Sequence, residues 1–265
     1  MRLLSSRAVR LATLVCSLFV LAAPTALAAD RYVALGDSFS SGVGTGSYAL
    51  SSSCKRSVYA YPSLVQQQRP NTALTFVACS GATTTDLMAS QIQAVTPDTA
   101  IVTVTIGGND IGFANLISQC TLGECSAALD ATRASLATTL NPRLDTVYTA
   151  IRSQAAFGAK VVVLGYPSEF TSAGCFGTLG ISATERTKAN QLAVALDNVI
   201  AARATDPAYA FTYKSALAPF APHAVCTSSP WLNGLNLFNT TESYHPNRNG
   251  QSQGYTPLVR SALGF

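Results

Sequence analysis

Short apolar runs rich in β-branched residues recur along the chain and constrain its fold more than any other feature. They lie at Tyr32 to Leu35, Leu74 to Ala78, Ala100 to Ile106, Lys160 to Leu164 and Phe211 to Tyr213. Runs of this length and composition are typical of buried β-strands. Because the longer segments between them have helical spacing, the pattern predicts a parallel sheet that is covered by helices on both faces.

The segments between these runs predict several helices. They span roughly Ala60 to Gln68, Ser126 to Ala156, Ser182 to Ala204 and Gln251 to Leu263. In the third, Leu192, Leu196 and Ile200 fall on one apolar stripe. Pro142 is expected to break or kink the second, because proline lacks an amide donor and clashes with the preceding turn.

Residues 1–28 have the features of a secretory leader. Arg2, Arg7 and Arg10 precede an apolar run over residues 11–21, and small residues at 26–28 offer a cleavage site. We therefore expect residues 29–265 to form one secreted, extracellular domain. No second apolar stretch approaches the roughly 20 residues of a membrane helix, so stable membrane insertion is not expected.

The charge balance argues against a nucleic-acid partner. The chain has 17 basic and 13 acidic residues, and three of the basic ones lie in the leader, which leaves a net charge of +1 for the remainder. A nucleic-acid-binding surface needs a marked excess of basic residues. We expect no such partner.

The cysteines beyond the leader predict disulfides. They are Cys54, Cys79, Cys120, Cys125, Cys175 and Cys226. Six cysteines allow 15 pairings, and an even count is typical of extracellular disulfide-bonded proteins. We expect the pairs 54–79, 120–125 and 175–226, because this pairing closes one tight loop and two larger loops, each within one region. No CxxC pair or histidine cluster indicates a metal site.

Polar or glycine-containing segments follow the first three predicted strands. They are Gly36-Asp37-Ser38, Cys79-Ser80-Gly81-Ala82 and Gly107-Gly108-Asn109-Asp110. Ligands of parallel sheets bind beyond the carboxyl ends of the strands, so we expect these segments at one edge. A serine hydroxyl is a weak nucleophile, and Ser38 would need a histidine within hydrogen-bond reach to attack a substrate.

Of the two histidines beyond the leader, His245 is the predicted base. It lies in TESYHPNRNG, where proline and asparagine predict a rigid turn, whereas His223 lies in a proline-flanked loop. Glu242 lies three residues before His245 and is predicted to orient the imidazole as the acid of a catalytic triad. The backbone carbonyl of Ser243 is the alternative acceptor, and it would leave a Ser-His dyad.

An ester hydrolase also needs donors for the oxyanion that forms during attack. The backbone N–H groups of Ser38 and Gly81 and the side-chain amide of Asn109 are the predicted donors. Each segment taken alone also fits a helix cap or a left-handed turn. The conjunction of three such segments with a histidine turn favours the catalytic interpretation.

The same segments resemble the SGNH hydrolases, also called GDSL esterases and lipases. GDSFSSG carries the serine, SGA the glycine, GGND the asparagine and HPN the histidine, in matching order from residue 31 to the C-terminus. Within that family the chain resembles the secreted lipases and esterases of actinomycetes, which share three disulfides between consecutive cysteines. Where the family pattern has aspartate, this chain has Glu242.

The resemblance implies a three-layer α/β/α, flavodoxin-like fold with a central, mostly parallel five-stranded sheet. It also implies hydrolysis of carboxylic esters through an acyl-enzyme. Ser38 would be the nucleophile, Gly81 and Asn109 would supply oxyanion donors, and His245 would be the base. We expect a monomer that needs no cofactor or metal ion.

Apolar residues near the motifs favour a lipid acyl ester as substrate. They are Tyr48, Leu50, Tyr59, Ile111, Phe113, Leu116, Ile117, Trp231, Leu232, Leu235, Leu237 and Phe238. The alternative is that most of them pack in the core. Lys55, Arg56 and Arg248 would suit a phosphate head group and so phospholipase A1 activity. The alternative functions are hydrolysis of carbohydrate O-acetyl esters at the same site and non-catalytic binding by the same fold.

Overall fold

Five parallel strands form the centre of the computed structural model, which describes residues 29–265. The predicted leader, residues 1–28, lies outside the described residues. The strands are β1 (Asp30–Gly36), β2 (Thr72–Phe76), β3 (Thr99–Thr105), β4 (Lys160–Leu164) and β5 (Thr212–Lys214). Every neighbouring pair is parallel, and the order β2-β1-β3-β4-β5 is that of flavodoxin-like folds.

All five predicted strands are confirmed, with ends that differ by at most two residues. Successive side chains of a strand point to opposite faces of the sheet. In β1, both Val33 and Ala34 are fully buried, and in β4 both Val163 and Leu164 are. The strands therefore read as continuous apolar runs because helices cover both faces of the sheet.

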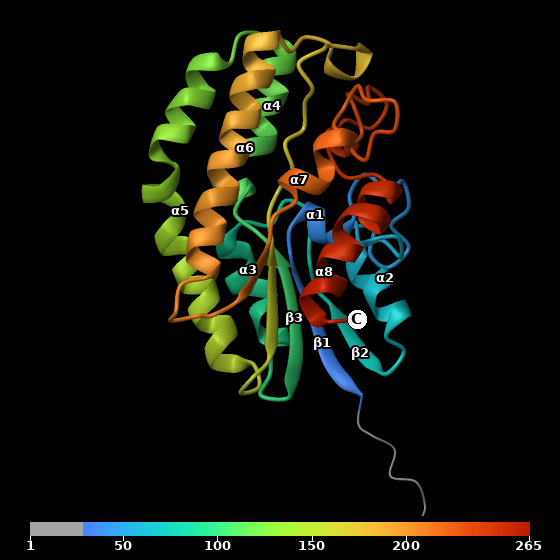
Figure 1. Ribbon diagram of the computed structural model, residues 1–265, viewed down its shortest axis with the longest axis vertical. Coiled ribbons are helices and arrows are strands. Elements are labelled where there is room, and N and C mark those ends of the chain that lie inside the picture. The colour runs from blue at the N-terminus through green and yellow to red at the C-terminus, as the bar shows by residue number, and fades with distance from the viewer. Residues whose placement is uncertain (1–28) are drawn as a thin grey trace, which may run out of the picture.

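Helices form the two outer layers (Figure 1). They are α1 (Ser38–Ser41), α2 (Tyr61–Gln68), α3 (Thr84–Ser90), α4 (Phe113–Leu122), α5 (Ser126–Gln154), α6 (Ala183–Ala204), α7 (Leu217–Phe220) and α8 (Thr256–Leu263). The long helices α5 and α6 pack side by side on one side of the sheet, and α2 and α8 pack together on the other. No helix within residues 29–265 combines the length and the apolar character needed to cross a bilayer.

Two helices differ from the sequence prediction. Of the break or kink predicted at Pro142, the break does not occur, because α5 is one helix of 29 residues that runs through the proline. Leu140 and Leu144 on either side of the proline are fully buried, so packing against the sheet and α6 holds the helix together. The predicted C-terminal helix divides into a π-helical turn (Gly250–Tyr255) and α8.

Buried Gln251 accounts for the position of the π-helical turn. Its side chain accepts a hydrogen bond from the Tyr61 N–H at 2.9 Å and donates one to the Phe39 carbonyl at 3.0 Å. These two bonds fasten the start of the C-terminal segment to α2 and α1. The turn therefore anchors the segment that directly follows His245.

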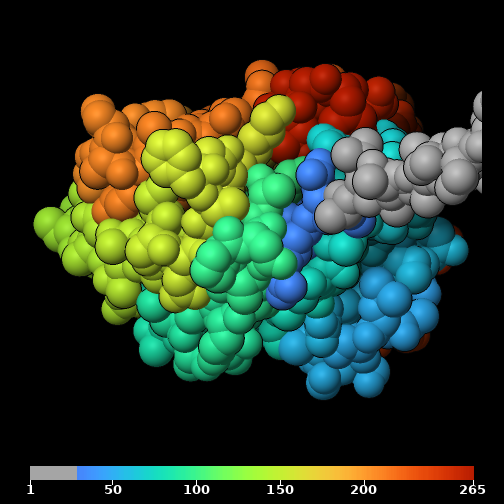
Figure 2. All heavy atoms as spheres, turned by 90° about the horizontal axis from the view of Figure 1, so that it is seen from below, coloured from blue at the N-terminus to red at the C-terminus, as the bar shows by residue number. Residues whose placement is uncertain are grey.

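Three disulfides join Cys54 to Cys79, Cys120 to Cys125 and Cys175 to Cys226. This is the sequential pairing. The bridges lie in the loops beyond the carboxyl ends of the strands and at the end of α4. Figure 2, the view from below, shows the first residues of β1 in blue at the opposite end of the molecule.

Candidate active site

The segments after β1, β2 and β3 meet at the carboxyl edge of the sheet, as their positions in the sequence predict. Ser38, Gly81 and Asn109 line one pocket together with His245, which comes from the far end of the chain. The pocket has a volume of about 380 Å³. This is within the range of sites that bind small molecules.

A tight turn between β1 and α1 presents Ser38 to the pocket. Gly36 has φ +128°, and a Cβ there would lie 2.5 Å from both the Ser40 Oγ and the Thr105 carbonyl oxygen. Only glycine fits this position. Asp37 then caps α1 by accepting a hydrogen bond from the Phe39 N–H at 3.0 Å. The helix cap and the serine that lines the pocket are thus two parts of one turn.

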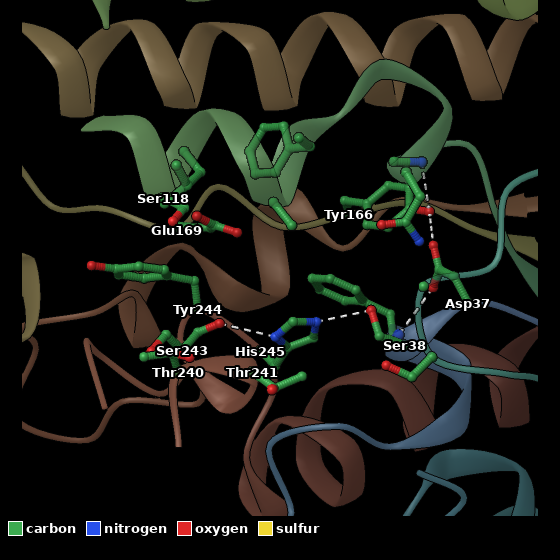
Figure 3. A pocket seen from close by; sticks show the side chains of 18 of the residues that line it. Asp37, Ser38, Ser118, Tyr166, Glu169, Thr240, Thr241, Ser243, Tyr244 and His245 are labelled. Atoms are coloured by element: carbon green, nitrogen blue, oxygen red, sulfur yellow. Dashed lines mark hydrogen bonds between the residues drawn. The ribbon is translucent and has the colours of Figure 1, made fainter. Parts of the chain in front are cut away.

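Asp37 also links this turn to two neighbouring loops. Its buried carboxyl group accepts a hydrogen bond from the Tyr166 hydroxyl, which in turn accepts one from the Gly108 N–H at 3.0 Å (Figure 3). Burial raises the pKa of Asp37 to about 7, against the opposing effect of the Tyr166 hydrogen bond. Asp37 therefore holds the loops after β1, β3 and β4 in register.

Ser38 and His245 form a direct hydrogen bond. The distance from His245 Nε2 to Ser38 Oγ is 2.8 Å, and the distance from His245 Nδ1 to the Ser243 carbonyl oxygen is 2.9 Å (Figure 3). A carbonyl can only accept, so Nδ1 carries the proton and Nε2 accepts from the serine. Burial lowers the pKa of His245 to about 4. The imidazole is therefore neutral near pH 7, which is the form that a general base requires.

The structure does not bring the Glu242 carboxylate to the imidazole. Glu242 Oε1 instead accepts a hydrogen bond from the Tyr48 hydroxyl at 2.5 Å. Burial, together with this hydrogen bond to Glu242, raises the pKa of Tyr48 to about 12, so the phenol keeps its proton. Of the two predicted acceptors for Nδ1, the Ser243 carbonyl is the one in contact.

The three predicted oxyanion donors belong to residues that line the pocket. The backbone N–H groups of Ser38 and Gly81 donate no hydrogen bond to any group in residues 29–265. Gly81 has φ +81° and open space around its missing Cβ, so the backbone conformation explains the glycine. Asn109 Nδ2 donates one hydrogen bond to the Ala82 carbonyl at 3.0 Å, which leaves its second N–H available.

The neighbouring Asp110 fixes the segment that carries Asn109. Its carboxylate accepts hydrogen bonds from the Thr84 N–H at 2.9 Å and the Thr84 hydroxyl at 2.6 Å. Arg143 of α5 adds an ion pair at 3.2 Å. The amide of Asn109 is therefore held between the start of α3 and the middle of α5.

The pocket walls only partly match the predicted apolar lining. The residues Phe113, Ile117, Leu235 and Leu237 line the pocket as expected. The other eight do not line it: Leu116, Trp231 and Leu232 are buried within the core, Phe238 is fully exposed, and Tyr48, Leu50, Tyr59 and Ile111 lie elsewhere. Further apolar lining comes from Phe39, Ala114, Leu122, Pro167, Ala193 and Leu196. The i, i+4 spacing of Phe113 and Ile117 was the signal for a helical wall that the sequence analysis missed.

The three basic residues predicted near the mouth make contacts with the protein itself. Lys55 lies over the ring of Tyr48, and Arg56 donates to the Phe76 carbonyl. Arg248 donates to the Thr45 carbonyl at 2.9 Å. None of the three lines the pocket.

Sequence reasoning missed two polar residues in the loop after β4. Tyr166 holds Asp37, and Glu169 lines the pocket. The rule that pointed to the first three loops applies equally to this one. His223, in contrast, stacks on Trp231 with ring centroids 3.8 Å apart and does not line the pocket.

One group of metal-ligating residue types lies close together in the described part of the chain. It comprises Cys120, Cys125 and Glu185. The two cysteines are joined to each other, so neither offers a thiolate. Glu185 accepts hydrogen bonds from the N–H groups of Cys125 and Ser182, both at 2.8 Å.

Two lipases of Streptomyces are similar to this chain over most of its length. The chain is 46% identical over 244 residues to a lipase from Streptomyces rimosus, covering 91% of this chain and 89% of that one. It is 43% identical to lipase 1 of Streptomyces coelicolor, covering 89% and 87% of the two chains.

Two crystal structures match closely. The extracellular lipase from Streptomyces rimosus aligns with a TM-score of 0.82 at 45% identity, over 88% of this chain and all of that one. Phospholipase A1 from Streptomyces albidoflavus aligns with a TM-score of 0.83 at 41% identity, over 89% and 100%. The model of the GDSL-like Lipase/Acylhydrolase family matches residues 34–253. The chain belongs to this family.

Proposed function

We propose that this protein hydrolyses lipid acyl esters through an acyl-enzyme, with Ser38 as nucleophile and His245 as general base. The observation that carries the proposal is the 2.8 Å contact between His245 Nε2 and Ser38 Oγ at the wall of an apolar pocket. A nucleophile within hydrogen-bond reach of a base that is itself oriented by a third group is the signature of covalent catalysis.

The reaction proceeds in two halves. His245 Nε2 takes the proton from Ser38 Oγ as that oxygen attacks the ester carbonyl. The N–H groups of Ser38 and Gly81 and the second N–H of Asn109 receive the oxyanion. Collapse of the intermediate breaks the bond to the alcohol, which leaves with the proton from Nε2. Water then repeats the sequence on the acyl-enzyme, releasing the acid and restoring Ser38.

The proposed base works as part of a dyad. The Ser243 carbonyl keeps the proton on Nδ1 and stabilises the imidazolium that forms during attack. The charge of Glu242 favours the imidazolium from further away. The carbonyl therefore takes the place that a carboxylate has in a triad.

An exposed apolar rim around the pocket supports a lipid–water interface as the site of action. The rim comprises Leu122, Phe176, Leu179, Leu237 and Phe238. It joins the end of α4 to the loop before His245, and the N–H of Leu235 binds the Gly177 carbonyl at 2.8 Å across the two loops. Contiguous exposed apolar residues mark interaction sites. The name of the Streptomyces albidoflavus relative makes phospholipids one substrate class to test.

We further infer that residues 1–28 are a secretory leader and that residues 29–265 act outside the cell as one monomeric domain without cofactor. The three disulfides support an oxidising compartment. The extracellular lipase of Streptomyces rimosus, with similar length and fold, supports the same location.

The test uses residues 29–265 with the disulfides formed. p-Nitrophenyl esters from acetate to palmitate measure chain-length preference, and phosphatidylcholine beside a triacylglycerol identifies the products by mass. We expect medium or long chains to be preferred and Ser38→Ala to be inactive. Strict preference for acetate would favour the carbohydrate O-acetyl esterase, and turnover by Ser38→Ala would remove Ser38 as nucleophile.

A further inference from the structure

Two buried polar groups that line the pocket have no role in the proposed reaction. The Oε2 of Glu169 and the hydroxyl of Tyr244 are both buried, and neither has a hydrogen-bond partner with favourable geometry in residues 29–265, although Thr121 lies near the Tyr244 hydroxyl. Both residues line the pocket. In Figure 3 they lie on the side of His245 that faces away from Ser38.

The chain holds Glu169 in this position. Its carbonyl accepts a hydrogen bond from the Val225 N–H at 2.9 Å. The next residue, Phe170, is joined to the Asn190 side chain in both directions, at 3.1 Å and 2.7 Å. The ring of Phe170 packs edge-on against that of Tyr244 with centroids 5.4 Å apart. These contacts fix the backbone that carries Glu169 and hold the ring of Tyr244 against the pocket.

Glu169 carries no compensating positive charge. None of the ion pairs within residues 29–265 includes it, and burial raises the pKa of its carboxyl group well above the usual value. A protonated carboxyl group offers one O–H donor and an acceptor oxygen, and the Tyr244 phenol offers the same pair.

An alkyl chain alone does not explain these groups. Buried polar atoms cost free energy unless they form hydrogen bonds, and an apolar pocket would accept a plain acyl chain better. A hydroxyl group both donates and accepts, so it can pair with a neutral acid or with a phenol. A cation would instead require the ionised carboxylate, which burial disfavours.

We propose that Glu169 and Tyr244 form a subsite for a hydroxyl group on the ester substrate, so that the enzyme prefers hydroxylated esters to plain ones. This inference rests on the proposed ester hydrolysis. The hydroxyl group lies either on the acyl chain or on the alcohol part, and the chemistry of recognition is the same for both.

Two sets of substrates separate these sources. The first keeps the p-nitrophenyl leaving group and compares decanoate with its monohydroxylated isomers, carbon by carbon. The second keeps a plain decanoyl group and compares its ester of a simple alkanol with its mono-ester of the matching diol. The readout is the ratio of kcat/KM for the hydroxylated ester to that for the plain one.

We expect this ratio to reach about tenfold for the best isomer in one set, as one or two net hydrogen bonds give. It should fall to about one in Glu169→Met and drop severalfold in Tyr244→Phe. Glu169→Gln should keep a raised ratio, because an amide also donates and accepts without a charge. Glu124→Gln, at an exposed glutamate outside the pocket, is the matched control and should keep the full ratio.

A ratio near one for every isomer in both sets overturns the inference, as does a raised ratio that survives in Glu169→Met. Preference for choline esters that disappears in Glu169→Gln would show that the carboxylate binds a cation and would overturn it as well. If Glu169→Met does not fold, the kcat/KM ratio of Tyr244→Phe tests the inference: a severalfold drop supports it, and an unchanged ratio overturns it. Ser38-dependent hydrolysis of plain esters with a flat ratio would refute the subsite and leave the proposed function standing.

Discussion

Replacing Glu242 with glutamine tests which group orients the catalytic imidazole. The substitution keeps the shape of the side chain and its ability to accept from the Tyr48 hydroxyl, but it removes the charge. If Glu242 were the acid of a triad, the loss would resemble that of a triad aspartate, about 10⁴-fold in kcat or ~5.5 kcal/mol.

The structure predicts a much smaller effect. Burial has the largest influence on the pKa of His245, the hydrogen bond to Ser243 comes second, and the charge of Glu242 comes last. The Ser243 hydrogen bond survives the substitution. If the distant charge is worth at most one pKa unit, its loss costs about 1.4 kcal/mol, or about tenfold in kcat/KM.

The assay is hydrolysis of p-nitrophenyl butyrate by wild type, Glu242→Gln, Tyr48→Phe and His245→Ala across a pH series. Tyr48→Phe is the matched control, because it removes the bond to Glu242 and keeps the carboxylate. We expect it to stay within about threefold of wild type, while His245→Ala loses at least about 10³-fold. A loss of 10³-fold or more in Glu242→Gln would refute the dyad.

Further predictions concern the base, the oxyanion donors and the disulfides. A neutral imidazole is the active form, so kcat/KM should stay constant as pH falls from 7 and decline only near the His245 pKa of about 4; a midpoint near 6.5 would contradict this. Asn109→Ala should lower kcat about 10²- to 10³-fold with little change in KM, and a rise in KM alone would argue against an oxyanion role. Removing Cys175–Cys226, which spans 51 residues, should cost about 4 kcal/mol in urea unfolding, and removing Cys120–Cys125, which spans 5, about 2 kcal/mol. The reverse order would show that loop entropy does not govern these bridges.

The sheet could be predicted from sequence because both of its faces are covered. A strand buried on both sides must be apolar at nearly every position, so Val161–Leu164 and Ile101–Val104 stand out as runs. The topology rule then places the loops after β1, β2 and β3 at one edge. The convergence of Ser38, Gly81 and Asn109 on one pocket follows from that rule.

The orientation of Glu242 could not be predicted, because sequence spacing does not determine where a side chain points. A residue three positions before His245 can reach the imidazole across a turn. Here Tyr48, nearly 200 residues away in the chain, binds that carboxylate instead. The competing partner comes from a loop whose place is set by tertiary packing.

The continuation of α5 through Pro142 and the helix α4 could not be predicted, for a related reason. Proline costs an isolated helix about 3 kcal/mol, but burial of Leu136, Leu140 and Leu144 along the same face of α5 outweighs that local cost. The helix α4 was not predicted, although its residues Phe113 and Ile117 were singled out as lining. Local propensity is a weak guide wherever long-range packing supplies most of the stability.

The positions of the three disulfides can be explained by the buried ionisable groups that the loops of the site carry. Asp37, Glu169 and His245 are ionisable groups held in buried surroundings, and their shifted pKa values mean that folding desolvates each of them at a cost. This desolvation lowers the stability of the loops, which bury less apolar surface than the sheet does. The bridge Cys54–Cys79 ends one residue before Ser80 of the pocket wall. Cys120 of the second bridge lies in α4, which lines the pocket. The bridge Cys175–Cys226 closes the region between Glu169 and the rim. All three bridges thus restrain the loops that carry the site, where covalent links can offset the stability lost to its polar groups.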